Sequence, residues 1–227
     1  MSDIAEIGAA TARLLLRAGA LMVAGERPFI LAGGWASPVY VDCRRLIGVP
    51  ELARGITDVL ECFVRLRFGE PPPFGIVAGG ETAGIPWAAW LSERLALPMR
   101  YVRKRPLGIG RHAQVEGGEV TGSRVLLVDD LITDGRSKVA FARGLRAGGA
   151  EARDVLVLFH NHAFPGCAER LEAEGLRLHA LADWSDLLGL PADEPLLTTE
   201  DRRVIGQFLA DPAGWSEAHE GRRADQG

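Results

Sequence analysis

Two adjacent aspartates, Asp129 and Asp130, directly follow the most apolar run of the chain, residues 125–128. Such a run predicts a buried strand, and in open α/β sheets ligands bind outside the carboxyl ends of the strands. Neighbouring carboxylates disfavour each other's ionised form unless a ligand or a cation offsets their charge. A vicinal diol suits them, because each carboxylate accepts hydrogen bonds from hydroxyl groups, and from the waters of a Mg2+ ion. The pair therefore predicts a ribose site.

The residues after the aspartates predict an anion site. They form a tight turn into a helix, and the N–H groups and dipole of a helix N-terminus attract a phosphate. A helix cap alone would need one acid and no glycine turn, so a structural role explains the segment less well. The order from diol to phosphate matches ribose 5-phosphate. The residues predicted to bind it, besides the aspartates, are Leu131, Ile132, Thr133, Asp134, Gly135, Arg136 and Ser137.

A second glycine-rich corner follows another predicted strand, residues 74–78. Its backbone N–H groups are suited to the other anionic end of the ligand, a pyrophosphate. A structural turn explains this corner equally well when it is considered alone. Together with the aspartate pair, it favours a pyrophosphate site made of Gly79, Gly80, Glu81, Thr82, Ala83 and Gly84.

A long loop, residues 104–122, contains five glycines and no apolar period. Loops of this length inside a compact domain are usually functional. Its basic entry suits the stabilisation of a departing pyrophosphate and the exclusion of water, although a solvated basic turn is the alternative. The cations concerned are Arg103, Lys104 and Arg105, with Arg111 and His112 further on.

Strands and helices that alternate along the chain must position these residues. Apolar runs predict strands at 74–78, 100–103, 125–128, 155–159 and 176–181. Helical spacing of apolar residues predicts helices at 3–24, 50–67, 84–97, 136–147, 165–174 and 198–210. This alternation predicts an α/β fold in which a mostly parallel central sheet carries helices on both faces.

The chain length suits one domain over residues 1–227. Residues 1–45 are expected to form an N-terminal helix and a small hood, in which the short apolar runs 29–31 and 39–41 make a hairpin-like element. Residues 212–227 are polar and are expected to be a frayed tail.

Composition excludes several classes of protein. The net charge is −4, so we expect no nucleic-acid partner and no attraction to an anionic membrane. The N-terminus lacks the pattern of a signal peptide, and no window holds 18 uncharged apolar residues, so we expect no membrane span. Three widely separated cysteines indicate a reducing compartment. A cytoplasmic location is therefore predicted.

Taken together, these stretches resemble the type I phosphoribosyltransferases, and most closely their orotate branch. The resemblance covers about residues 26–185 and includes the glycine corner, the basic loop entry and the segment 125–137. Many proteins share that segment, whereas residues 37–42 and the pair Arg103-Lys104 point to the orotate branch.

The resemblance implies a homodimer that transfers ribose 5-phosphate from 5-phosphoribosyl-1-pyrophosphate (PRPP) to orotate, with Mg2+ present. Orotidine 5'-phosphate and pyrophosphate would be the products. It implies catalytic roles for Arg103, which would bind the pyrophosphate, and for Lys104, which would reach the neighbouring subunit's site. Asp129 and Asp130 would hold the ribose hydroxyls and contact Mg2+ only through water, so no direct metal ligand is predicted.

The resemblance also implies where the base would lie. Thr133 would contact the pyrimidine, and the backbone of Tyr40 and Val41 would line its pocket. His160 and His162 follow a strand where some members of the family place an arginine. A metal role for these histidines is conceivable, but the spacing shows no third ligand.

Four positions depart from the pattern of the family. Leu107 and Ile109 stand where a catalytic lysine and a histidine are expected, and Ala83 replaces a lysine that some members carry. Asp134 lies inside the phosphate turn, where a carboxylate repels a phosphate unless Arg136 or another cation offsets it. Because of the altered loop, two alternatives stay open beside the working enzyme. One is a PRPP-binding regulatory or scaffold protein, and the other is a phosphoribosyltransferase for another base.

Restoring the two polar groups of the loop tests this interpretation. The double substitution Leu107→Lys/Ile109→His is expected to raise the turnover of orotate and PRPP on the order of 100-fold, the typical contribution of one preorganised group. The decrease of orotate absorbance measures the rate. Unaltered turnover in the double variant would mean that these two positions do not limit catalysis.

Overall fold

A six-stranded sheet forms the centre of the computed structural model, which describes residues 3–31, 33–106 and 114–222. Its strand order is β10-β9-β8-β5-β6-β7, and neighbouring strands are parallel except for β6 and β7. The strands are β5 (Ile76–Gly80), β6 (Met99–Val102), β7 (Val115–Glu116), β8 (Arg124–Ile132), β9 (Glu151–His160) and β10 (Arg177–Asp183).

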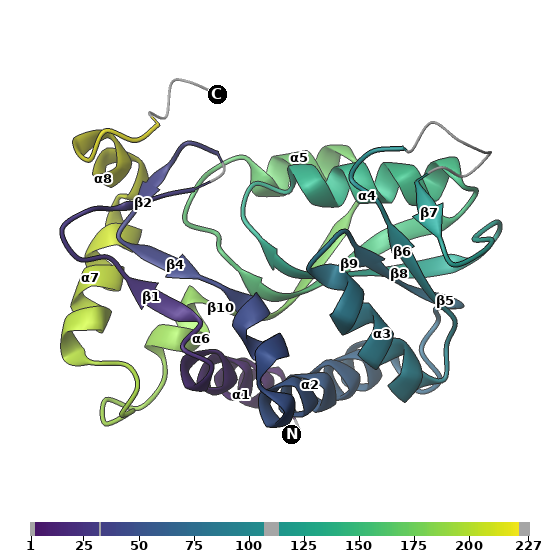
Figure 1. The fold of residues 1–227 in the computed structure, drawn as a ribbon, viewed down its shortest axis with the longest axis horizontal. Coiled ribbons are helices and arrows are strands. Elements are labelled where there is room, and N and C mark those ends of the chain that lie inside the picture. Colours follow the sequence, from purple (N-terminus) through teal and green to yellow (C-terminus); the bar gives the residue numbers. More distant parts are fainter. Residues whose placement is uncertain (1–2, 32, 107–113, 223–227) are drawn as a thin grey trace.

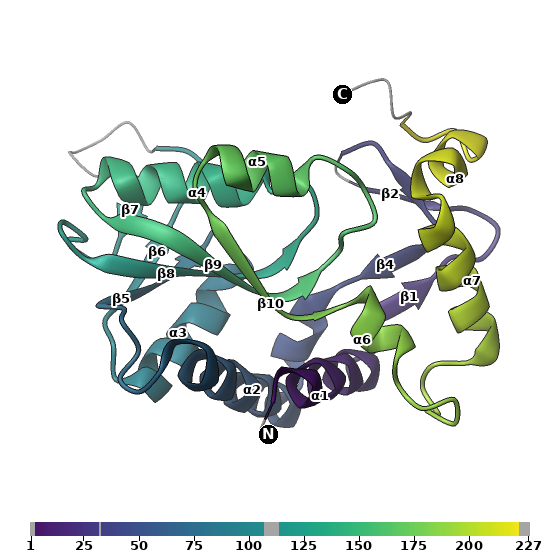
Figure 2. The ribbon, with the colours of Figure 1, turned by 180° about the vertical axis from the view of Figure 1, so that it is seen from behind.

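Helices cover both faces of this sheet (Figure 1, Figure 2). One face carries α1 (Ile4–Arg17), α2 (Pro50–Phe68) and α3 (Gly84–Leu95), and the other carries α4 (Arg136–Ala147) and α5 (Cys167–Ala173). Residues 125–128 of the central strand β8 are completely buried, as expected for a strand covered on both sides. The predicted α/β fold is confirmed. Within the described ranges, no helix has the length and apolarity that crossing a bilayer requires.

The hood consists of two small antiparallel sheets beside the main one. Strand β1 (Leu21–Val23) pairs with β4 (Val39–Val41), and β2 (Phe29–Ile30) pairs with β3 (Ala36–Ser37). The predicted helix 3–24 is therefore too long, because the helix ends at Arg17 and its last predicted residues form β1. The predicted hairpin is also wrong, because β2 and β4 each pair with a different strand. A 3-10 helix, η1 (Cys43–Gly48), leads from the hood into α2.

The C-terminal segment packs against the hood instead of fraying. It contains α6 (Trp184–Leu188), α7 (Thr199–Ala210) and α8 (Pro212–Ala218). Ser216 of α8 is fully buried, and its hydroxyl accepts the N–H of Ala36 at 3.0 Å and donates to the carbonyl of Arg222 at 2.8 Å. The prediction of a frayed tail from residue 212 is therefore wrong for residues 212–222. The prediction relied on the polar composition and missed the helix N-cap Asp211, whose side chain accepts the N–H of Gly214 at the start of α8.

Two strands differ from prediction in a way that matters for function. The central strand β8 extends to Ile132, so Asp129 and Asp130 lie in its last part and not after it. Strand β7 falls inside the predicted loop 104–122, where Val115 pairs with Val102. In β8 the pairing with β9 continues past the two aspartates to Ile132, and β7 forms because Val115 and Glu116 pair with β6.

Candidate active site

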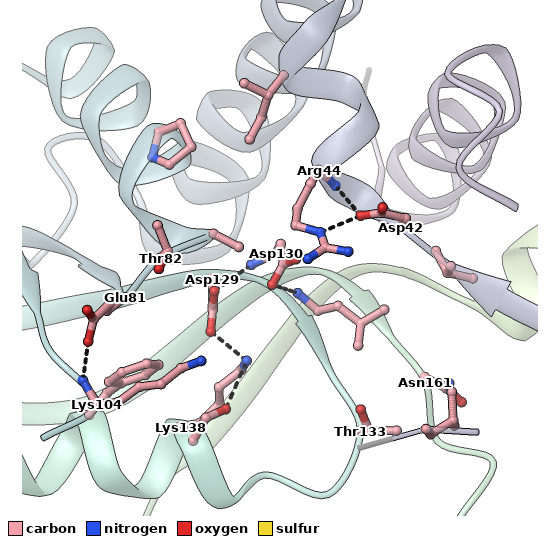
Figure 3. A pocket seen from close by; sticks show the side chains of 18 of the residues that line it. Asp42, Arg44, Glu81, Thr82, Lys104, Asp129, Asp130, Thr133, Lys138 and Asn161 are labelled. Atoms are coloured by element: carbon pink, nitrogen blue, oxygen red, sulfur yellow. Dashed lines mark hydrogen bonds and ion pairs between the residues drawn. The ribbon is translucent and has the colours of Figure 1, made fainter. Parts of the chain in front are cut away.

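A pocket of about 730 Å³ lies between the hood and the carboxyl ends of the central strands (Figure 3). It brings together eleven of the predicted site residues: Tyr40, Val41, Glu81, Thr82, Ala83, Lys104, Asp129, Asp130, Leu131, Thr133 and Ser137. The predicted residues that do not line it are Gly79, Gly80, Gly84, Arg103, Ile132, Asp134, Gly135 and Arg136. Residues that were not predicted also line it: Leu31, Asp42, Arg44, Ile47, Pro86, Lys138, Phe141 and Asn161.

The aspartate pair lies at the floor of this pocket and is offset by a buried lysine. The ammonium of Lys138, on the first turn of α4, lies 2.5 Å from Asp129 Oδ2. The other oxygen of Asp129 accepts the N–H of Asp130 at 3.0 Å, and Asp130 Oδ1 accepts the N–H of Leu131 at 2.8 Å. Asp129 is buried, whereas Asp130 is partly exposed. A cation thus balances one of the two carboxylates before any ligand binds.

Burial raises the pKa of Asp130 to about 6, and the charge of Asp129 acts in the same direction. Lys138 opposes both effects and favours the ionised carboxylate. Asp130 is therefore mostly ionised at neutral pH and able to accept hydrogen bonds from hydroxyl groups. As expected for adjacent carboxylates, the charge of Asp129 raises the pKa of Asp130, the more exposed of the two.

The turn at residues 133–137, which is predicted to bind phosphate and is called the phosphate turn here, has the predicted geometry at its helix end. Gly135 has φ +77°, a conformation that glycine adopts without strain, and it precedes the first residue of α4. The Asp134 carboxylate accepts the N–H of Arg136 at 3.1 Å and lies 3.3 Å from Arg136 Nε. The cation that the sequence required beside Asp134 is therefore in place, on the exposed side of the turn. Thr133 and Ser137 line the pocket, and Ser137 Oγ lies 3.4 Å from the ammonium of Lys138.

The glycine corner packs tightly onto the end of β8. A Cβ atom on Gly84 would lie 2.4 Å from the carbonyl oxygen of Val128, and one on Gly79 would lie 2.7 Å from the carbonyl oxygen of Gly84. A side chain at Gly84 would push the corner away from the aspartates, and one at Gly79 would push β5 away from the start of α3. Gly79 and Gly84 thus act by permitting close approach, while Glu81, Thr82 and Ala83 face the pocket.

The basic entry to the loop divides into two differently placed residues. Lys104 lines the pocket, and its backbone N–H donates to Glu81 Oε2 at 2.8 Å, which ties the loop to the glycine corner (Figure 3). The guanidinium of Arg103 instead donates to Glu116 Oε1 at 2.9 Å and lies over the ring of Tyr101. The expected contact of Arg103 with pyrophosphate stays a prediction, since this side chain is held at the edge of the sheet.

Both ends of the loop are joined at its base. The backbone N–H of Arg103 donates to the backbone carbonyl of Gln114 at 2.8 Å. The side-chain NH2 of Gln114 donates to the backbone carbonyl of Arg103 at 2.9 Å. The two ends of the loop therefore lie side by side, next to Lys104. Four residues named from the sequence, Leu107, Ile109, Arg111 and His112, lie outside the described residues.

The hood and the end of β9 form the opposite end of the pocket. Tyr40 and Val41 line it from β4, as predicted, and Thr133 lines it from the phosphate turn. Asn161 adds a buried amide, whose Oδ1 accepts the indole N–H of Trp184 at 3.1 Å and the N–H of Ala163 at 3.3 Å. Because both partners are obligate donors, the Asn161 oxygen faces them and its NH2 group faces another direction.

A second charged pair lies where the hood meets the pocket. Arg44 of η1 donates to Asp42 Oδ1 at 2.6 Å, and this hydrogen bond lowers the pKa of the Asp42 carboxyl. The same hydrogen bond raises the pKa of the Arg44 guanidinium, and the charge of Asp130 acts in the same direction. Arg44 therefore places a positive charge on the hood side of the aspartate pair (Figure 3).

The two histidines do not form a metal site in the structure. His162 Nε2 lies 3.7 Å from Asp183 Oδ2, and the ring centroids of His160 and His162 are 5.4 Å apart. Burial lowers the pKa of His160, which favours its neutral form. Among residues 3–31, 33–106 and 114–222, no group of three or more His, Cys, Asp or Glu side chains is arranged to hold a metal.

The pocket residues that were not predicted gave weak signals in the sequence. Lys138 follows the phosphate turn directly, but a lysine in the first turn of a helix is more often solvated. Asn161 lies between His160 and His162, and the pattern there indicated a role for the histidines instead of the asparagine. Asp42 ends the segment 37–42 that points to the orotate branch, and Arg44 follows it by two residues, but the resemblance gave neither residue a role.

Comparison with known proteins is consistent with this geometry. The model of the phosphoribosyl transferase domain family matches residues 50–165. Orotate phosphoribosyltransferase of Dinoroseobacter shibae is 45% identical over 217 residues, which cover 96% of this chain and 96% of that protein. The structure of orotate phosphoribosyltransferase from Aeropyrum pernix matches with a TM-score of 0.67 and 35% identity, covering 78% of this chain and 96% of that one.

A solved structure with a bound ligand gives a similar match. Orotate phosphoribosyltransferase of Mycobacterium tuberculosis H37Rv in complex with PRPP has a TM-score of 0.58 and 27% identity, over 80% of this chain and 98% of that one. These matches confirm the type I phosphoribosyltransferase fold that the resemblance implied. The chain belongs to the orotate phosphoribosyltransferase family.

Proposed function

We propose that this chain transfers the 5-phosphoribosyl group of PRPP to orotate, giving orotidine 5'-phosphate and pyrophosphate. The observation that carries this proposal is the convergence of four parts on one pocket: the aspartate pair, the phosphate turn, the glycine corner and the hood. Each part suits one section of the two substrates. Relatives that match nearly the whole chain are named orotate phosphoribosyltransferases, which disfavours the regulatory alternative.

The ribose 5-phosphate would lie along the end of β8 and the start of α4. Asp130, which is partly exposed and mostly ionised at neutral pH, accepts hydrogen bonds from the ribose hydroxyls. The 5'-phosphate binds the N–H groups of the turn at 133–137 and the hydroxyls of Thr133 and Ser137. The carboxylate of Asp134 does not oppose this, because it faces Arg136 on the exposed side.

The pyrophosphate would lie between the glycine corner and Lys104. The N–H groups of residues 81–84 and the Lys104 ammonium offset the charge that develops on the leaving group. Mg2+ is expected to enter with PRPP. Asp129 and Asp130 would contact the ion only through its waters. The protein contributes little covalent chemistry and acts by positioning the sugar carbon between the base and the leaving group.

Orotate would occupy the end of the pocket beneath the hood. The backbone of Tyr40 and Val41, the Thr133 hydroxyl and the Asn161 amide surround this space. Trp184 and Ala163 hold the oxygen of the Asn161 side chain, so the NH2 group is available as a donor to a carbonyl of the base.

We also propose that the enzyme works as a homodimer in the cytoplasm. The family resemblance supports the homodimer, and the three widely separated cysteines support the location. In the single chain described, Lys104 lines the pocket of its own subunit. We propose that Lys104 acts in that pocket, whereas the entry into the neighbouring subunit's site that the resemblance implies stays a prediction, as do the effects of Leu107 and Ile109 on the rate.

The first test measures turnover directly. Purified protein with Mg2+ and PRPP is expected to consume orotate, followed by the loss of orotate absorbance, and to form stoichiometric pyrophosphate. Adenine, which has no carbonyl group, is expected to react far more slowly, since it would leave the buried Asn161 donor unpaired. No turnover with orotate, while PRPP still raises the melting temperature, would support the regulatory alternative.

A second prediction concerns pH. The Asp130 carboxyl has its pKa raised to about 6, so it loses its charge as the pH falls through that value. The kcat/KM for PRPP is therefore expected to fall about ten-fold per pH unit below pH 6. Protonation of PRPP itself affects every variant alike, so Asp130→Asn is the matched comparison. An identical acid limb in Asp130→Asn and the wild type would contradict the role of Asp130.

A third prediction concerns the base. Asn161→Asp replaces the NH2 donor by an acceptor of similar shape, which is expected to lower kcat/KM for orotate about 10- to 100-fold. The Kd for PRPP is expected to stay unchanged. His162→Ala is the control, since this neighbouring side chain lies outside the pocket lining. Equal effects of Asn161→Asp on orotate and PRPP would argue against a specific contact with the base.

A further inference from the structure

Lys138 is a buried cation inside the proposed PRPP pocket. Its side chain is 5% exposed, and its ammonium lies 2.5 Å from Asp129 Oδ2 and 3.4 Å from Ser137 Oγ. An ammonium carries three donors and loses much solvation when buried, so it persists only beside strong acceptors. Asp129 is the ionic partner that the structure provides for it.

The Lys138–Asp129 pair connects the three parts of the site that would hold PRPP. Lys138 belongs to the first turn of α4, beside the phosphate turn, whereas Asp129 belongs to the end of β8. Asp129 also touches the glycine corner, since a Cβ on Gly80 would lie 3.2 Å from its Oδ2 and one on Gly84 would lie 3.1 Å from its Oδ1. One ion pair therefore fixes the phosphate turn, the strand end and the pyrophosphate corner relative to one another.

The charge of the pocket gives this pair a second consequence. Among the described residues, the lining contains four carboxylates and three cations: Asp42, Glu81, Asp129, Asp130, Arg44, Lys104 and Lys138. Arg44 already pairs with Asp42 on the hood side. Without Lys138, two adjacent carboxylates would face a ligand that carries several negative charges, and the other cation on the first turn of α4, Arg136, is already paired with Asp134.

We propose that Lys138 is a positioning residue for phosphoribosyl transfer, which orients the Asp129 carboxylate against the glycine corner and offsets its charge so that PRPP can bind. This inference rests on the proposed function. Lys138 acts through Asp129 and through the geometry of the turn, and it transfers no proton or group. Its contribution appears in the affinity for PRPP before chemistry begins, and only secondarily in the affinity for orotate.

The test uses Lys138→Met, which keeps the length of the side chain and removes its charge. Calorimetric titration with Mg2+ and PRPP is expected to show a Kd raised about ten-fold or more, because the Asp129 charge is left unpaired. The KM for PRPP is expected to rise in parallel, whereas the KM for orotate changes little. Arg143→Met is the matched control, an exposed cation on the same helix that pairs with Glu174 away from the pocket.

A double-mutant cycle separates positioning from simple stabilisation. Asp129→Asn/Lys138→Met leaves no unpaired buried charge, so it remains available if Lys138→Met alone does not fold. It is expected to bind PRPP as Asp129→Asn does, because residues that act through one another are not additive. Independent, additive losses would overturn the proposal. So would a Lys138→Met protein with a lower melting temperature but unchanged affinity for PRPP, since Lys138 would then serve only the fold.

Failure of the proposed function is recognised separately. The binding measurement needs no acceptor base, so a wild-type protein that binds PRPP without consuming orotate would overturn the acceptor assignment and leave the role of Lys138 standing. A wild-type protein that does not bind PRPP at all would overturn both.

Discussion

The placement of two carboxylates side by side at the end of a buried strand is the constraint on which the rest of the site depends. Asp129 has almost no access to water, and its negative charge is tolerated because Lys138 lies 2.5 Å away. The glycines of the corner allow neighbouring backbone to approach the same carboxylate closely. With Asp129 satisfied internally, Asp130 is the member of the pair that remains available to a ligand.

The other elements follow from that arrangement. Parallel strands bring their carboxyl ends to one edge of the sheet. The glycine corner at the end of β5, the turn after β8 and Asn161 after β9 therefore all meet at the pocket. The hood closes this edge from outside, and the C-terminal helices α7 and α8 lie beside the hood (Figure 1). Ser216 of α8 is buried against β3 and accepts the N–H of Ala36, which is one contact that holds the C-terminal helices to the hood.

Much of this could be predicted from local patterns. Apolar runs and helical periods gave the α/β sheet, and strand-end position gave Asp129, Asp130 and the phosphate turn. What could not be predicted depends on partners distant in sequence. The pairing of β1 with β4, the burial of Lys138 and the orientation of the Asn161 amide by Trp184 each involve residues whose neighbours are set by packing. The pairing of Arg103 with Glu116 of β7 could not be predicted either, because a pattern of cations does not reveal a partner on a neighbouring strand.

The central claim is that the end of β8 and the start of α4 hold the sugar phosphate of PRPP, while the glycine corner holds the pyrophosphate. A crystal structure of the protein with Mg2+ and PRPP tests it most directly. We expect the ribose hydroxyls within hydrogen-bond distance of Asp130, the 5'-phosphate on the N–H groups of residues 133–137, and the pyrophosphate against residues 81–84. A complex in which the sugar lies away from Asp130, or in which the two anionic ends are exchanged, would contradict this.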